Sequence, residues 1–371
     1  MCKWLLIFLF PFVSFAQSEN NELLYVSVKP KLGFLAAHRG VMGHLPQQSC
    51  RGVEVSLYKR FASDKKWKTS YRNPYAGITA YGSTVGNNEV LGQAFGAYAF
   101  LEFPFVENKF HVLTFKLSSG LGYITKVFDQ EKNPKDVAMS THLNALICLG
   151  FTGRFKLNER NQILYSLDMT HLSNGSYQVP NLGLNMPYLG LGYAYSFRST
   201  EKKPYSFDTL QQQAAVSPRW FGNWRLSMLA IGSFKEVFPT GGKKYPVYAL
   251  SISARKIFRV KTGMEVSLDL ISKQALYGYK SYIPKNEWKI FQVGVYAGYV
   301  LPLDRFHFVL GMGAYVKDRY NPDNGLYHRL GMRYQFDNGL IANLTLKAHW
   351  AKADYVEWGI GYTFKNKWSK R

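Results

Sequence analysis

The sequence predicts an all-β protein, an antiparallel transmembrane β-barrel fold built from two tandem eight-stranded repeats. Three observations lead to this prediction. Apolar residues alternate with polar or small ones through many segments of about ten residues, as in 53–58 and 346–350, and a period of two is typical of strands. The segments are even in number, as bacterial barrels require. No apolar run of about 18 residues follows residue 16, so no helix is expected to cross a bilayer.

The chain begins with a pattern typical of export. Lys3 precedes an apolar run over residues 4–13, and the short sequence Ser-Phe-Ala at 14–16 comes before Gln17. A positive residue, an apolar stretch and small residues in this order predict a cleaved secretory signal over residues 1–16.

The composition limits the classes of partner. Lysine and arginine number 46 against 24 acidic residues, a net charge of +22. This balance favours attraction to phosphate-bearing lipid, with a lysine-rich solvated surface as the plainer alternative. Nucleic acid is disfavoured, because the charge is spread over the whole chain without a recognisable binding motif. Cys2 is expected to leave with the signal, and Cys50 in a loop and Cys148 in mid-strand predict no disulfide.

The first half of the chain contains eight predicted strands, joined by connections that alternate in length. Short periplasmic turns and long outer loops explain this alternation. With the amino terminus in the periplasm, the seventh strand runs outward, and its end, which holds His171, is expected at the outer leaflet. The tight connections are 62–66, 106–108 and 157–160, and the long ones lie near 38–52, 125–138 and 174–184. The strands are predicted near 24–37, 53–61, 67–82, 89–105, 109–124, 139–156, 161–173 and 185–198.

The second half reads as a duplication of the first. A polar linker over 199–218 separates a barrel over 17–198 from a second barrel repeat over 219–371. One sixteen-stranded barrel is the alternative, and contact between the first and eighth strands would exclude it. Both halves end on the spacing Gly-x-x-aromatic-x-aromatic, which resembles the terminal signal read by barrel-assembly machinery: Gly190, Tyr193 and Tyr195, then Gly359, Tyr362 and Phe364. The second set of strands is predicted near 222–236, 245–258, 262–273, 288–301, 305–317, 326–336, 340–350 and 355–364.

Three polar side chains share the face of the first barrel that is expected to contact lipid. His171 and Ser173 are in phase with the apolar residues of the seventh strand, and Asn185 is in phase with those of the eighth. Polar groups on a hydrocarbon-facing wall are costly, so this phase favours a function.

The three residue types suit hydrolysis by a serine. Residues two apart on a strand project to the same side, so His171 can accept the proton of the Ser173 hydroxyl. Asn185, on the neighbouring strand, is the candidate that orients the imidazole, and Asn174 or nearby backbone N–H groups are candidates for the oxyanion site. A His-x-Ser pair alone is common, so the prediction depends on its context.

The stretches 171–175 (HLSNG) and 180–185 (PNLGLN) resemble the active-site segment of the outer-membrane lipid A 3-O-deacylase (acyloxyacyl hydrolase-like) family. The resemblance covers roughly residues 20–198. It implies an eight-stranded barrel that removes the 3-linked hydroxyacyl chain from lipid A, with Ser173 as nucleophile and His171 as base. The family's third residue is usually glutamate. Asn185 stands there in this chain and supplies no negative charge, although asparagine can orient a histidine.

The second half does not repeat this pattern. His349 is expected to point to the barrel interior, and Ala351 stands where a serine would be needed. Asp354 lies eight residues before Tyr362, as Asn185 lies eight before Tyr193. The second barrel is therefore predicted to be non-catalytic.

Other candidate ligands have plainer interpretations. His38 and His44 fall in the first outer loop, and the His and Cys residues show no zinc-ligand spacing. Asp323 and Asn324 are weak candidates for calcium. No cofactor and no metal are predicted.

These inferences lead to one enzymatic hypothesis and two alternatives. The leading hypothesis is a carboxylic ester hydrolase in the outer membrane of a Gram-negative bacterium, which acts on lipopolysaccharide with Ser173, His171 and Asn185. Its expected partners are lipid A, outer-membrane lipid and the assembly machinery. A non-enzymatic barrel that retains a relic site, as a pore, adhesin or envelope stabiliser, is the first alternative. An acyltransferase or phospholipase using the same serine is the second.

Overall fold

The computed structural model describes residues 23–61, 66–197, 224–237, 239–279, 285–320, 325–350 and 352–364. The predicted signal over 1–16, the predicted linker over 199–218, the calcium candidates Asp323 and Asn324, and Ala351 lie outside these residues.

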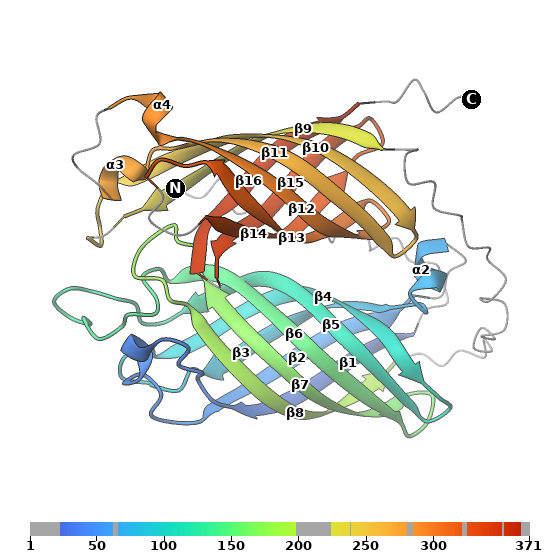
Figure 1. Ribbon diagram of the computed structural model, residues 1–371. Coiled ribbons are helices and arrows are strands. Elements are labelled where there is room, and N and C mark those ends of the chain that lie inside the picture. The colour runs from blue at the N-terminus through green and yellow to red at the C-terminus, as the bar shows by residue number, and fades with distance from the viewer. Residues whose placement is uncertain are drawn as a thin grey trace, which may run out of the picture. The chain divides into compact units, whose positions relative to one another are not determined.

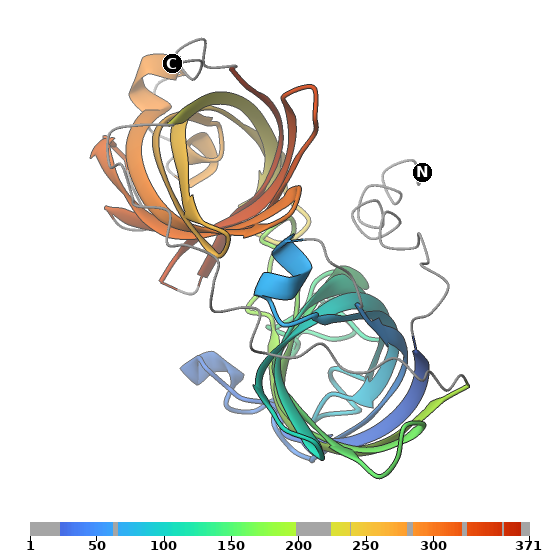
Figure 2. The ribbon, with the colours of Figure 1, turned by 90° about the vertical axis from the view of Figure 1, so that its right-hand side faces the viewer.

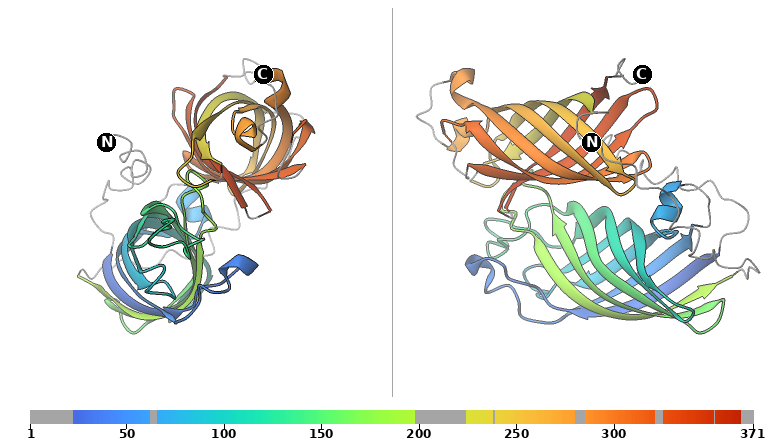
Figure 3. Two further views of the ribbon diagram at one scale, coloured as in Figure 1. Left: turned by 90° about the vertical axis from the view of Figure 1, so that its left-hand side faces the viewer. Right: turned by 45° about the vertical axis from the view of Figure 1, so that its right-hand side comes forward.

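The chain forms two closed antiparallel barrels of eight strands each, which Figure 1 labels and Figure 2 shows nearly end-on. In the first barrel β1 pairs with β8, and in the second β16 pairs with β9. A sixteen-stranded barrel would leave β1 and β8 apart, so the prediction of two barrels is confirmed and the single large barrel is wrong. The strands of each barrel are tilted across its wall, as closure of eight strands requires (Figure 3).

The strands of the first barrel are β1 (Leu24–Gly33), β2 (Cys50–Arg60), β3 (Tyr75–Thr84), β4 (Gln93–Glu107), β5 (His111–Ile124), β6 (Leu143–Lys156), β7 (Asn161–Ser173) and β8 (Leu184–Ser196). Those of the second are β9 (Arg225–Glu236), β10 (Lys244–Arg259), β11 (Thr262–Lys273), β12 (Phe291–Leu303), β13 (Phe306–Lys317), β14 (Leu326–Gln335), β15 (Leu340–His349) and β16 (Lys352–Thr363). The helices are short: η3 (Gly40–Met42), α2 (Lys66–Ser70), α3 (Leu276–Tyr279) and α4 (Glu287–Ile290). In the described part of the chain, no helix is long and apolar enough to span a membrane.

Two predictions about the first barrel's strands need correction. The third strand was expected from residue 67, but helix α2 occupies that stretch and β3 begins at Tyr75. Arg72 and Asn73 between them have φ angles of 59° and 50°, a left-handed conformation that interrupts a strand. Most of the expected tight turn over 62–66 lies outside the described residues, and the connection from Arg60 to Tyr75 contains α2. Cys50, expected in a loop, is the first residue of β2.

The alternation read from the sequence separates the two faces of the wall. On β7, Leu167 is 56% exposed, while its neighbour Asp168 is 4% exposed. On β8, Leu189 is 66% exposed and Tyr188 is buried. The apolar face therefore points outward and the polar face lines the interior, which is the arrangement of a transmembrane barrel.

Ion pairs fill the interior of each barrel. In the first, the Glu54 carboxylate lies 2.9, 2.7 and 3.4 Å from the ammonium nitrogens of Lys29, Lys31 and Lys116. In the second, the Arg329 guanidinium lies 2.9 Å from Asp269 and 2.6 Å from Glu357. Eight strands enclose a lumen that side chains can fill, and here buried ion pairs lie in it together with buried tyrosines such as Tyr58 and Tyr98.

Candidate active site

The end of β7 and the start of β8 bring His171 and Asn185 together. The two residues are direct partners in the antiparallel register. Nδ1 of His171 lies 2.6 Å from Oδ1 of Asn185. An amide oxygen only accepts, so the proton of this hydrogen bond belongs to Nδ1, and Nε2 of His171 carries the free lone pair.

Ser173 follows two residues later on the same outward face. Although Leu167 and Met169 on this face are exposed to 56% and 41%, Ser173 is only 9% exposed. Gly183 explains part of this burial. A Cβ built on Gly183 would lie 3.0 Å from Cε1 of His171 and 3.6 Å from Cβ of Ser173, so the glycine backbone packs on both residues. Its φ of +77° also favours glycine at this position.

The side chain of Asn181 contacts the candidate nucleophile. Its Nδ2 donates to Oγ of Ser173 at 2.9 Å, and its Oδ1 accepts from the backbone N–H of Asn174 at 3.1 Å. Sequence reasoning included Asn181 in the Pro-Asn-x-Gly element without assigning it a role. That element was the signal that could have identified it.

Asn174, the predicted oxyanion candidate, lies next to Ser173 with its side chain turned toward another loop. Its Nδ2 donates at 3.1 Å to Oγ of Ser140 and at 3.1 Å to Oγ1 of Thr141. These bonds fix the amide near the nucleophile. They also mean that the loop before β6 supports the site, which the sequence did not indicate, because residues 139–142 were expected to begin a strand.

His38, for which no site role was expected, reaches Asn185 from the loop between β1 and β2. Nδ2 of Asn185 lies 3.0 Å from Nδ1 of His38. The backbone N–H of Ala36 donates to the carbonyl of Asn185 at 2.9 Å, so the chain beyond β1 continues alongside β8. Barrel closure brings these segments together, although 147 residues separate His38 from Asn185 along the chain.

Asp136 holds the loop that packs against this site. Its Oδ1 accepts from the backbone N–H groups of Ala138 and Met139 at 3.0 and 2.9 Å. The carbonyl of Ala138 in turn accepts from the N–H of Gly183 at 3.1 Å. Oδ2 of Asp136 is buried and has no hydrogen-bond partner among the described residues. Burial raises the pKa of Asp136 from its ordinary value to about 7.

This raised pKa predicts that the protein loses stability as pH rises. The folded protein keeps a proton on Asp136 that the unfolded chain releases, so the free energy of unfolding should fall between about pH 4 and about pH 7. Asp136→Asn keeps the Oδ1 acceptor without the ionisable group. We expect this variant to be more stable than the wild type at pH 8, by up to about 4 kcal/mol, and nearly equal to it at pH 4.

Urea unfolding of the full-length protein in detergent micelles at both pH values measures this difference. Glu131→Gln, at an exposed carboxylate in the same loop, is the matched control. An Asp136→Asn variant that follows the wild-type pH dependence would contradict the prediction.

The second barrel arranges its own histidine and carboxylate differently. His349 is buried, with Nδ1 2.7 Å from the carbonyl of Leu326 and Nε2 3.2 Å from Asp354. Asp354 also pairs with Lys235 and Lys273. The register shifts between Lys347 and Ala348, and this irregularity accompanies the inward position of Asp354, in contrast to the outward Asn185. Asp354 and Asn185 each lie eight residues before a closing tyrosine, but they face opposite sides of their barrel walls.

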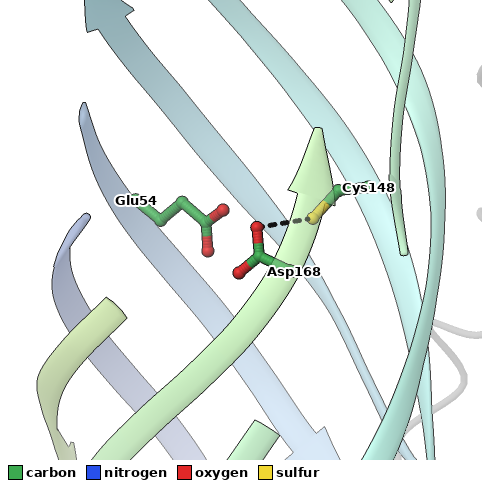
Figure 4. A group of neighbouring side chains, drawn as sticks. All are labelled: Glu54, Cys148 and Asp168. Carbon is green, nitrogen blue, oxygen red and sulfur yellow. Dashed lines mark hydrogen bonds between the residues drawn. The ribbon is translucent and has the colours of Figure 1, made fainter. Parts of the chain in front are cut away.

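A group of potential metal ligands lies inside the first barrel, where lysines already neutralise it. Oxygens of Glu54 and Asp168 and the Sγ of Cys148 lie within 4.8 Å of one another (Figure 4). Nζ of Lys31 bonds to both carboxylates, and Lys29 and Lys116 also approach Glu54. Because these ammonium groups take the positions that a cation would occupy, the group functions as an ion-pair network. Both Cys50 and Cys148 are free and buried.

Comparisons with known proteins show which family models the chain matches. Residues 51–194 match the family model described as lipid A 3-O-deacylase, and residues 224–367 match the model described as acyloxyacyl hydrolase, C-terminal domain. A comparison with curated protein sequences found no match. Among solved structures, Neisserial surface protein A is similar at 10% identity, covering 47% of this chain and 97% of its own, with a TM-score of 0.33. A mutant of the Rh. blastica porin is similar at 10% identity over 92% of this chain and 99% of its own, with a TM-score of 0.20.

Proposed function

Because the chain belongs to the lipid A 3-O-deacylase family, we propose that it is an outer-membrane serine esterase that removes the 3-O-linked acyl chain from the lipid A of lipopolysaccharide. The observation that carries this proposal is the group at the end of β7. His171 is bonded to Asn185 and stands two residues from Ser173, on the wall whose other side chains are apolar and exposed.

The proposed reaction is an acyl transfer through Ser173. His171 accepts the hydroxyl proton at Nε2 as Oγ attacks the ester carbonyl of the 3-linked chain, and Oδ1 of Asn185 holds the Nδ1–H of the imidazole. Asn174, whose backbone N–H lies next to the nucleophile, and Asn181, whose amide donates to Oγ of Ser173, are the candidates for stabilising the oxyanion.

Collapse of the tetrahedral intermediate breaks the ester C–O bond, and the proton on His171 passes to the departing sugar hydroxyl. Water, deprotonated by the same imidazole, then releases the fatty acid from Ser173. No cofactor takes part in these steps.

The position of the group supports a substrate that lies in a lipid leaflet. With the amino terminus in the periplasm, the end of β7 lies at the outer leaflet, where lipopolysaccharide is expected. The outward face of β7 and β8 would contact acyl chains. The aromatic closing segments that end on Tyr195 and Phe364 would direct insertion by the barrel-assembly machinery.

The non-enzymatic alternative rests on Asn185, which replaces the carboxylate usual in the family. As a pore it has less support, because ion-paired side chains project into both lumens. The second barrel, in which His349 and Asp354 point inward, is proposed to be non-catalytic.

Lipid A mass spectrometry tests the proposal. Cells that express the protein should contain lipid A that lacks one 3-linked hydroxyacyl chain, and cells that express Ser173→Ala should retain that chain. Surface labelling shows whether each variant reaches the membrane. Unchanged acylation in cells with folded wild-type protein, or chain loss that persists in Ser173→Ala, would refute the proposed function.

A further inference from the structure

We infer that His38 is a positioning residue that sets the orientation of the Asn185 amide and thereby the tautomer of His171. This inference rests on the proposed function and deepens it. Its basis is two contacts of the Asn185 side-chain amide. Oδ1 lies 2.6 Å from Nδ1 of His171, and Nδ2 lies 3.0 Å from Nδ1 of His38.

An asparagine differs from a glutamate in having two unlike ends. A carboxylate accepts from an imidazole with either oxygen, whereas an amide accepts at one end and donates at the other. With Oδ1 toward His171, the imidazole carries its proton on Nδ1 and keeps Nε2 free for the Ser173 proton. If the amide turned over, Nδ2 would donate to Nδ1 of His171, and the neutral ring would carry its proton on Nε2. His171 could then not act as the base.

The neighbour on the other side of the amide decides between these two orientations. In the productive one, Nδ2 of Asn185 donates to His38, so Nδ1 of His38 must be an acceptor and the ring must be neutral with its proton on Nε2. A His38 that is protonated on both nitrogens can only donate, and it therefore favours the reversed amide. Neutral His38 with its proton on Nε2 thus selects the orientation in which His171 is a base.

The backbone holds His38 where it can do this. The N–H of Ala36 donates to the carbonyl of Asn185 at 2.9 Å, and that of Phe34 donates to the carbonyl of Pro187 at 3.3 Å. His38 therefore follows a segment fixed along the edge of β8. His171, across Asn185 on β7, interacts electrostatically with His38, and Arg39 follows His38 in the chain. A positive charge on His38 would also repel one on His171.

Two substitutions at His38 test whether its hydrogen-bond acceptor orients Asn185. His38→Ala removes the acceptor. We expect kcat for lipid A to fall about tenfold, because a tenfold change corresponds to the net strength of one ordinary hydrogen bond. KM should change little. His38→Asn keeps an acceptor near the position of Nδ1 without an ionisable ring. It should therefore retain kcat.

The Asn185→Glu background provides the internal control. A carboxylate accepts from His171 in either orientation, so His38→Ala should have little effect on kcat when Glu replaces Asn185. His44→Ala is the matched histidine variant, because His44 lies in the same loop and contacts the carbonyl of Lys135. Equal loss of kcat from His38→Ala in both backgrounds, or a change in KM alone, would overturn the inference.

A measurement without substrate keeps this inference separate from the proposed function. Nitrogen NMR of the full-length protein in micelles, labelled with ¹⁵N-histidine, reports the tautomer of His171. At pH 8 the wild type and His38→Asn should show the Nδ1–H form, and His38→Ala should shift toward the Nε2–H form. An unchanged tautomer in His38→Ala overturns the inference. The expected shift supports it even if the wild type leaves lipid A intact, a result that refutes only the proposed function.

Discussion

Replacement of His171 by alanine is expected to lower kcat for lipid A deacylation by at least about a thousandfold, because Ser173 then has no base to accept its proton. The outward wall of β7 remains apolar in this variant, so the barrel should fold and insert. Purified protein assayed on lipid A in mixed micelles, with the released fatty acid quantified by mass spectrometry, gives kcat and KM separately.

His111→Ala is the control for this substitution. His111 begins β5 and contacts the Tyr165 hydroxyl at 2.9 Å, on the same wall but toward the opposite rim from the candidate site. The deacylation activity of the His111→Ala variant should equal that of the wild type. A His171→Ala variant that keeps more than about a tenth of wild-type kcat would mean that another group accepts the proton.

Replacement of Glu54 by glutamine is expected to destabilise the first barrel by about 3–5 kcal/mol, because it removes one charge from a buried ion network. Glu54 is 1% exposed and lies near three ammonium groups, those of Lys29, Lys31 and Lys116. The glutamine has nearly the same volume, so the loss reflects charge and not packing. Urea unfolding of the full-length protein in lipid vesicles, followed by tryptophan fluorescence, measures it.

Glu159→Gln is the matched control, since Glu159 is exposed in the turn between β6 and β7. It should change the free energy of unfolding by less than about 0.5 kcal/mol. Equal stability of Glu54→Gln and the wild type would show that the lysines release their protons at no cost, and that the interior network does not hold the barrel together.

Much of the fold was predictable because a barrel wall imposes a strict period of two. Apolar residues such as Leu167 and Leu189 must face outward, and polar residues such as Asp168 must face the lumen, so the sequence records each strand directly. The prediction was wrong where local conformation interrupts this period. Residues 66–74 continue the apolar pattern closely enough to suggest a strand, but they form helix α2 and a turn with left-handed residues.

Part of the candidate site was also predictable from local order. His171 and Ser173 are two residues apart on one strand, and Asn185 follows across a single loop, so phase alone gave all three the same outward face. Asn181 belonged to a recognisable element, yet its bond to Ser173 depends on how the 174–183 loop folds back. Sequence pattern does not determine the path of such a loop.

The sequence by itself predicted the strand count, the inward and outward faces, and Asn185 as the candidate partner of His171, because each depends on residues that are close along the chain. The tertiary structure decided what depends on closure. Pairing of β1 with β8 distinguishes two small barrels from one large barrel, and it also brings His38 to Asn185. Strand alternation is the same in an eight-stranded and a sixteen-stranded barrel, so the contact that completes the candidate site becomes visible only when the first strand meets the eighth.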